Sequence, residues 1–432
     1  MLKGLFGTSG FLKNTAILIM GTGIAQAIPI ILQPVLRRVY APEDFGAFAV
    51  YFSLIGILTV IANFRYDLAI GLPEKDEDGA SLVFLTLMIN FIFNSFLLIV
   101  ILLFRENIAQ FLKFPEKFSY FLLLLPFSTF FFCSFQAMNF WLIRKKAFSA
   151  LSINKISRRG AEGVVQLAFG LFRNSSGLFW ADIAGSISNN LSGIRQMRKT
   201  SFSLLFYSRQ RIIKVMKRYS GFPKFNLVPH LLGTIAMQLP VFMINRLYTK
   251  TELGFFDLTQ QAILAPFALI SVAVSQVLLQ RVSEKKHNRE KLFHDFRNLS
   301  LLLFAIGITS VVVIELWGPK LFSLVFGSKC LIAGTYSRVL VVGYMFFLVV
   351  SPMGAILMGL EEIRVFSLWN ILHFLLLVGL YFVKDIAFID FLKLYVGIEI
   401  VAFSILYAWI TKTVIKYEKQ LSFNGSDNLG QL

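Results

Sequence analysis

The chain has little of what metal sites, disulfide scaffolds and cofactor-binding enzymes need. Among its 432 residues there are two cysteines and four histidines. Cys133 lies within an apolar run and Cys330 in a loop, so the sequence predicts no disulfide framework. The histidines show no metal-ligand spacing, and no glycine-rich loop of the phosphate-binding type is present. We therefore expect neither a bound metal nor a cofactor.

The chain is also poor in acidic residues and in long polar stretches. It has 24 acidic residues against 42 lysines and arginines, while 56% of its residues are hydrophobic and 47 are phenylalanines. A soluble chain of this length could not bury so much apolar surface in one core. A bilayer accommodates it, and about twelve runs approach the ~20 apolar residues of a spanning helix. The sequence predicts an all-α, polytopic membrane protein with about twelve transmembrane helices.

The net charge of +18 falls between the apolar runs. With the N-terminus in the cytosol, roughly twice as many lysines and arginines fall in inner loops as in outer ones, and the positive-inside rule then places both termini in the cytosol. No stacking platform or nucleic-acid-binding motif accompanies the basic residues. We therefore expect a multi-pass membrane protein that has no nucleic-acid partner.

A short motif occurs twice and divides the chain. Arg38–Phe48 and Arg246–Phe256 share arginine, tyrosine, acid, glycine and phenylalanine in the same order and at the same spacing. The corresponding pairs include Asp44 with Glu252 and Gly46 with Gly254. Each acid lies where a helix N-terminus favours negative charge. The alternative is a chance similarity between two loops, but duplication is typical of transporters built from repeats. We predict two six-helix halves around a central cavity.

These patterns predict four segments. Residues 1–200 form the first six-helix half, and residues 225–412 form the second. Residues 201–224 connect them, and the stretch Phe202–Tyr219 mixes apolar with basic side chains. Such a stretch suits a helix lying on the inner membrane surface. Residues 413–432 form a polar cytosolic tail that we expect to be disordered.

The most informative polar pattern lies in Ala150–Phe172, the fifth expected span. Lys155, Arg158, Arg159 and Glu162 follow helical spacing and share one face. A charge in hydrocarbon costs roughly 3 kcal/mol or more, so this face should line a wet cavity or meet a partner. Three cations against one acid leave positive charge, and arginine holds phosphate oxygens in a bidentate fork. The alternative is that Lys155 and Arg158 only mark a helix end and reach toward the interface.

Further polar residues interrupt the other apolar runs. The additional candidates for binding phosphate or sugar are Arg65, Arg37, Arg38, Gln26, Gln33, Gln238, Asn245 and Arg246. Uncharged side chains on a membrane helix can contact a sugar or bond a neighbouring helix, and both readings stay open. The candidate ion-coupling acids are Glu162, Asp67, Asp257, Glu315 and Glu399. An acid within a span can carry a proton, and a local hydrogen bond is the alternative for each.

Several segments resemble one known family. In the first half they are Lys13–Thr15, Gly21–Gly23, Pro34, Arg38, Tyr40, Pro42–Gly46, Arg65–Ile70 and Leu72–Pro73, and in the second half Tyr219–Phe225, Leu239–Pro240, Gly254–Phe256, Pro266 and Ser275–Val277. They are similar to bacterial polysaccharide-biosynthesis flippases of the multidrug/oligosaccharidyl-lipid/polysaccharide exporter superfamily. The match is specific at Arg65–Ile70 and Tyr219–Phe225, and vague beyond the ninth span. The family usually has glutamate at the position of Asp67. This chain departs from the family there, but aspartate keeps the negative charge.

The resemblance implies a flippase for O-antigen, capsule or exopolysaccharide, with no enzymatic activity. Its cargo would be an oligosaccharide repeat unit on undecaprenyl pyrophosphate, moved from the inner to the outer leaflet of the bacterial inner membrane by alternating access. Membrane lipids and other polysaccharide-assembly proteins would be its further partners. One alternative is a small-molecule or drug antiporter of the same superfamily, for which an acidic or aromatic cavity is expected. Another is a membrane glycosyltransferase or polymerase, which would need a large external loop or an acid motif.

Overall fold

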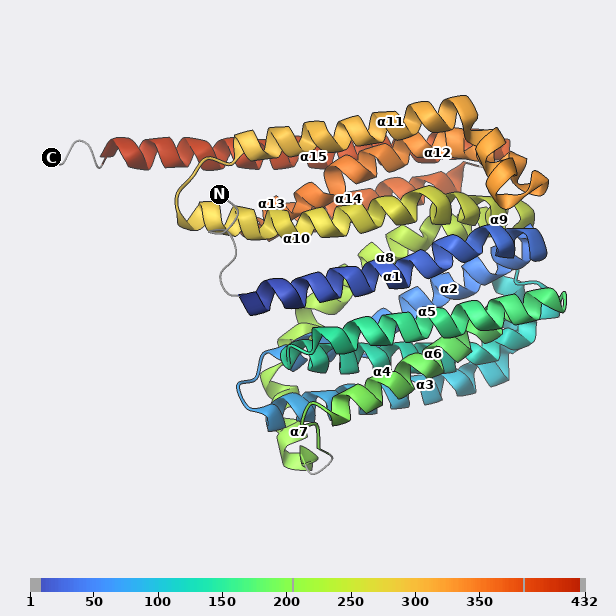
Figure 1. Ribbon diagram of the computed structural model, residues 1–432, viewed down its shortest axis with the longest axis horizontal. Helices are drawn as coiled ribbons and strands as arrows, with labels where there is room; N and C mark the ends of the chain where they lie inside the picture. The colour runs from blue at the N-terminus through green and yellow to red at the C-terminus, as the bar shows by residue number, and fades with distance from the viewer. Residues whose placement is uncertain (1–8, 204–205, 384, 428–432) are drawn as a thin grey trace. The chain divides into compact units, whose positions relative to one another are not determined.

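The computed structural model describes residues 9–203, 206–383 and 385–427, and every regular element in these ranges is helical (Figure 1). One long helix or helical segment corresponds to each predicted span, which confirms the all-α prediction. The long helices are α1 (Ser9–Val39), α2 (Pro42–Ala62), α3 (Asp76–Phe111), α4 (Leu125–Arg144), α5 (Phe148–Leu171), α6 (Gly177–Arg198), α8 (Gly221–Leu247), α10 (Ala265–His287), α11 (Phe293–Phe326), α12 (Leu331–Val350), α14 (Ile363–Gly379) and α15 (Phe388–Asp427).

Shorter helical pieces connect or extend these helices. They are η2 (Tyr66–Gly71), η3 (Glu116–Leu124), α7 (Arg209–Arg218), α9 (Lys250–Thr259), η5 (Gln260–Leu264), η6 (Ser328–Cys330), η7 (Ser351–Met353), α13 (Gly354–Gly359) and η8 (Leu380–Phe382). Among the described residues, eight segments are long and apolar enough to cross a membrane. Those eight do not include α1, α5, α6 and α15. Hydropathy alone therefore misses helices, such as α5, that carry polar faces.

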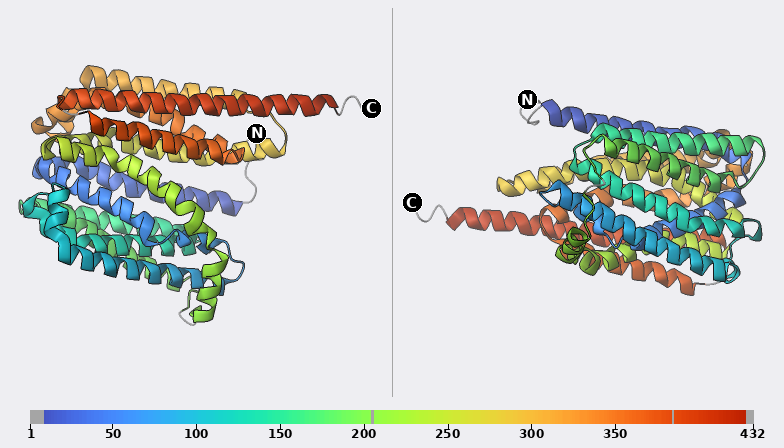
Figure 2. Two further views of the ribbon diagram at one scale, coloured as in Figure 1. Left: turned by 180° about the vertical axis from the view of Figure 1, so that it is seen from behind. Right: turned by 90° about the horizontal axis from the view of Figure 1, so that it is seen from below.

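The chain forms two compact units, unit 1 (Met1–Gly254) and unit 2 (Phe255–Leu432). In unit 1, α5 lies beside α1 and α6 (Figures 1 and 2), and α8 packs along α2. In unit 2, α12 packs against both α11 and α15. The boundary between the units falls inside the second copy of the repeated motif. The sequence-based division into halves stays a prediction.

The two copies of the motif begin their helices in the same way. The Ala41 N–H donates to the Asp44 carboxylate at 3.2 Å, and the Thr249 N–H donates to the Glu252 carboxylate at 2.8 Å. In each copy the acid therefore bonds the amide three residues before it, as in a capping box. The expectation that both acids lie at helix N-termini is confirmed.

The glycines of the two copies make reciprocal contacts within unit 1. A Cβ atom on Gly46 would lie 2.2 Å from the Lys250 carbonyl oxygen, and one on Gly254 would lie 1.9 Å from the Pro42 carbonyl oxygen. Only a residue without a side chain fits at such distances. Pro42 and Lys250 are corresponding positions of the motif, so each copy's glycine faces the same position of the other copy. Such reciprocal contacts are expected when two copies of a duplicated segment pack about a local two-fold axis.

The basic connector contains a short amphipathic helix, α7. Its Ile212 and Val215 are buried in a cluster with Trp141 of α4. Arg211 pairs with Glu77 at the start of α3, with 2.8 Å between the charged atoms. The apolar face of α7 is thus covered by unit 1, and its remaining basic residues are exposed. A position on the inner membrane surface stays a prediction.

Residues 413–427 of the tail that was expected to be disordered are helical, and its last residues, 428–432, lie outside the described part of the chain. Helix α15 continues to Asp427. The Tyr417 hydroxyl donates to the Glu290 carbonyl at 3.3 Å, and the Glu418 carboxylate accepts the Leu292 N–H at 2.9 Å. These bonds fasten the extension of α15 to the α10–α11 connection of unit 2.

Candidate functional site

The polar face of α5 forms a bonded network in unit 1. Arg158 Nε lies 2.7 Å from one Glu162 oxygen, and Arg159 Nη1 lies 2.8 Å from the other. A single carboxylate therefore holds two guanidinium groups. Glu162 is only 7% exposed, and α6 makes room for it at Gly185, where a Cβ atom would lie 2.2 Å from Glu162 Cγ.

A second acid, Asp182 of α6, completes the network. It is buried, and its carboxylate lies 3.4 Å from Arg158 Nη2 and accepts the Ser128 hydroxyl at 2.6 Å. Ser128 is in turn bonded to the Tyr51 hydroxyl at 2.7 Å. Three cations, counting Lys155, thus face two acids, so the positive excess is smaller than the sequence indicated. The sequence analysis did not predict Asp182, because no other charged residue lies near it in its expected span. The one signal in the sequence was an acidic residue within an expected membrane span.

The three cations of α5 differ in exposure. The Arg158 side chain is 14% exposed and the Arg159 side chain 36% exposed. Lys155 Nζ donates to the Thr22 hydroxyl of α1 at 2.9 Å. Arg158 is thus held by two acids and Lys155 by a neighbouring helix, whereas Arg159 pairs with Glu162 alone and is the more exposed of the two arginines.

The candidates on α1 have structural contacts. Arg37 is 4% exposed, and its guanidinium donates to Gln33 at 2.9 Å and to the Gly254 carbonyl at 3.1 Å. The guanidinium carbon also lies 3.5 Å from the centre of the Phe45 ring. Arg37 and Gln33 therefore stabilise the contact between the two motif copies. The remaining candidates on α1 are Gln26, which is half-buried, and Arg38, which is exposed.

The candidates on α8 bond neighbouring helices of unit 1. Gln238 accepts the Ser53 hydroxyl of α2 at 3.0 Å. The buried Asn245 donates to the Leu112 carbonyl at 2.5 Å, and the Arg246 side chain is exposed. For Gln238 and Asn245 the structure thus shows the helix-to-helix bonds that were the alternative to sugar binding.

Arg65 and Asp67 lie at the turn into η2. Phe64 and Arg65 both adopt left-handed conformations, with φ of 46° and 61°. Asp67 is 1% exposed, and no side chain of a described residue donates a hydrogen bond to its carboxylate. Burial raises the pKa of Asp67, while the positive charge of Arg65 and the backbone N–H groups of Asp67 and Leu68 oppose this shift. Asp67 is therefore a buried acid whose neutral form is favoured.

The candidate acids of unit 2 differ in burial. Glu399 is 8% exposed and lies 3.0 Å from Nε2 of His373 on α14. Asp257 is half-buried, whereas Glu315 lies on the exposed face of α11. Glu399 is thus a buried acid in contact with a histidine, and the sequence did not reveal this partner.

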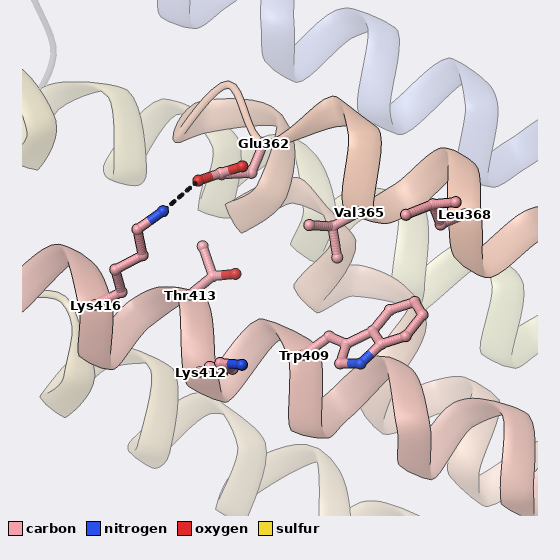
Figure 3. Close-up of a pocket in the computed structure, with 7 residues that line it drawn as sticks. All are labelled: Glu362, Val365, Leu368, Trp409, Lys412, Thr413 and Lys416. Carbon is pink, nitrogen blue, oxygen red and sulfur yellow. Dashed lines mark hydrogen bonds and ion pairs between the residues drawn. The ribbon is translucent and has the colours of Figure 1, made fainter.

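Unit 2 also contains cavities. One of about 320 Å³ lies between α11, α12 and α15, and is lined mainly by apolar side chains with Arg297 and Tyr407. Another of about 270 Å³ lies between α14 and α15 (Figure 3). Neither is lined by a candidate residue from the sequence.

The helices together have a known transporter fold. A multidrug resistance MATE family transporter of the MOP superfamily in its inward-facing conformation matches with a TM-score of 0.70 and 15% identity, over 93% of this chain and 99% of that one. The outward-facing form gives 0.62 and 15% identity, over 94% and 96%. A MOP superfamily transporter from Pyrococcus furiosus, whose binding pocket is described as having reverse polarity, gives 0.61 and 14% identity over the same shares. These identities show the fold alone: a polytopic, all-α membrane protein of the MATE type.

The chain belongs to the polysaccharide biosynthesis protein family, whose model matches residues 35–377. The teichuronic acid biosynthesis protein TuaB of Bacillus subtilis (strain 168) is 21% identical over 37% of this chain and 33% of its own length. The succinoglycan biosynthesis transport protein ExoT of Rhizobium meliloti (strain 1021) is 23% identical over 67% of this chain and 55% of its own length. The matches thus span between a third and just over half of these relatives. Membership confirms the resemblance seen in the sequence.

Proposed function

We propose that this protein is a flippase, and not an enzyme, that moves an undecaprenyl-pyrophosphate-linked oligosaccharide from the inner to the outer leaflet of the bacterial inner membrane. Both termini would lie in the cytosol. Family membership and the MATE-type fold support the transport activity. The observation that supports this cargo most directly is the buried network of Arg158, Arg159 and Glu162 on α5, in which one arginine remains partly exposed.

The geometry of the network suits a phosphate group. The two oxygens of Glu162 each take one guanidinium, as two oxygens of a phosphate would. In the proposed cycle Glu162 is the counter-ion of the empty site, and pyrophosphate takes its place on Arg159. Asp182 keeps Arg158 in position during this exchange, because it accepts a hydrogen bond from Nη2, a different nitrogen of that guanidinium. The net positive charge of the face favours the anionic ligand.

Alternating access needs two states of comparable energy and a force that moves the protein between them. We assign a coupling proton to Glu399, because its carboxylate is buried and lies 3.0 Å from the imidazole of His373. Gln26 of α1 is the half-buried polar candidate for the sugar. Two states would then differ in the ligand on Arg159 and in the proton on Glu399.

The decisive experiment is deletion of the gene in its own host. The lipid-linked oligosaccharide should accumulate in the inner leaflet, measured by its resistance to an external glycosidase, and the wild-type gene should restore its exposure. Normal exposure after deletion would contradict the proposal.

The MATE-type fold favours one alternative, a drug antiporter. That activity predicts increased sensitivity to cationic drugs after deletion, without accumulation of the lipid-linked unit. A glycosyltransferase or polymerase would instead leave shortened glycans. The three outcomes are therefore distinct.

A further inference from the structure

The cavity between α14 and α15 has a polar end and an apolar end, and Figure 3 shows this separation. Its polar lining comes from Glu362, Lys412, Thr413 and Lys416. Its apolar lining comes from Val365, Leu368 and Trp409. The cavity belongs entirely to unit 2 and is separate from the α5 network.

The lining residues of α15 form layers along the helix. Trp409, Lys412 and Lys416 recur every three or four residues, so they share one face. At 1.5 Å per residue, the step from Trp409 to Lys416 covers about 10 Å along the axis. Leu368 of α14 is 58% exposed at the apolar end. Apolar surface followed by tryptophan and then by lysine is the order found where a helix leaves a bilayer.

The polar end offers more donors than acceptors. The side chains of Lys412 and Thr413 make no hydrogen bond or ion pair with the described part of the chain. Lys416 Nζ lies 3.4 Å from the Glu362 carboxylate, a long contact between side chains that are 63% and 39% exposed. Two lysines thus face one acid, and the hydroxyl of Thr413 adds a neutral donor. An anion with several oxygens fits this end.

We propose that this cavity binds an anionic phospholipid, with its phosphate at Lys412, Thr413 and Lys416. The first part of an acyl chain lies along Leu368 and Trp409. A phosphate without a chain would leave the apolar end empty, and a zwitterionic lipid would bring an additional cation to two lysines. The lipid bridges α14 and α15, so its binding stabilises their contact. This inference is independent of the proposed cargo.

The test uses the full-length protein in detergent and a short-chain phosphatidylglycerol as the probe. Its dissociation constant is compared with those of phosphatidylcholine with the same chains and of inorganic phosphate. We expect phosphatidylglycerol to bind most tightly. Lys412→Gln with Lys416→Gln should weaken it by about 25-fold, since a lysine near an anionic lipid contributes roughly fivefold. Glu362→Gln should tighten binding by up to about fivefold, because it removes the competing acid.

A matched control removes the same charge elsewhere in unit 2. Lys320→Gln with Lys329→Gln changes two exposed lysines and should leave binding unchanged. If this control loses as much affinity as the cavity variant, the lipid is attracted by the positive charge of the protein in general, and the assignment of the binding site to this cavity is wrong. Equal binding of inorganic phosphate would overturn the lipid assignment, and equal binding of phosphatidylcholine would overturn the requirement for an anionic head group. Elution of each variant as a monodisperse peak shows that the protein is folded.

Discussion

The buried ionisable groups of unit 1 and unit 2 have different partners. In unit 1, Arg158 and Arg159 share Glu162, and Arg158 also meets Asp182. In unit 2, Glu399 meets His373. Arginine stays charged at all physiological pH values. We propose that the first network holds an anion and that the second pair exchanges a proton.

The largest effect is expected from Arg158→Ala in unit 1. It leaves Glu162 and Asp182 without their shared cation in a buried site, and removing one partner of a buried ion pair costs about 3–5 kcal/mol. We expect a strong loss of protein abundance in the membrane, measured by immunoblotting. Arg158→Lys should recover part of it. Normal abundance of Arg158→Ala would show that the network does not stabilise unit 1.

Arg159→Ala should separate function from stability. Its side chain is 36% exposed, so its pairing with Glu162 contributes at most about 1 kcal/mol after solvent screening. Loss of a charged hydrogen bond to pyrophosphate should reduce export by about 10–100-fold at normal abundance. Arg159→Lys should be partly active and Arg159→Glu worse than alanine, because glutamate repels phosphate. Normal export by Arg159→Ala would remove the α5 face from the binding site.

Glu399→Gln tests the assignment of the proton to unit 2. Glutamine keeps the shape and a hydrogen bond to His373 but cannot exchange a proton. In vesicles, an imposed pH gradient should stimulate transport by the variant about tenfold less than transport by the wild type. This factor is within the usual range of coupling between two sites. Glu315→Gln, an exposed acid of the same unit, is the matched control. Unchanged stimulation in Glu399→Gln would assign the coupling elsewhere.

The smallest effect is expected from Asp67→Asn, which should change the melting temperature in the opposite direction from Glu162→Gln. Burial raises the pKa of Asp67 in the folded protein, so the folded state binds more protons than the unfolded state. The free energy of unfolding therefore falls as pH rises from the unfolded pKa through the folded one. Asp67→Asn removes the ionisable group, so the free energy of unfolding no longer falls with pH at this position. The substitution should therefore raise the melting temperature at neutral pH. Glu162→Gln should lower it, because Glu162 is paired with two arginines. A lower melting temperature for Asp67→Asn would contradict a net cost of burying the charged carboxylate.

Features that repeat along one helix could be predicted from the sequence. The shared face of Arg158, Arg159 and Glu162 follows from helical spacing, and the capping acids Asp44 and Glu252 follow from their place before apolar runs. Partners on other helices could not be predicted. Asp182 and His373 each stand alone in their own segments, and no spacing rule connects residues on different helices.

The sequence by itself determined that this protein is helical and that it lies in a membrane, because composition and periodicity act on each segment separately. Only the tertiary structure decided which charges are neutralised. It brought Asp182 to Arg158, and it held Arg37 against Gly254 at the contact of the two motif copies. Ion pairing depends on distances of a few ångströms, and packing between helices fixes those distances.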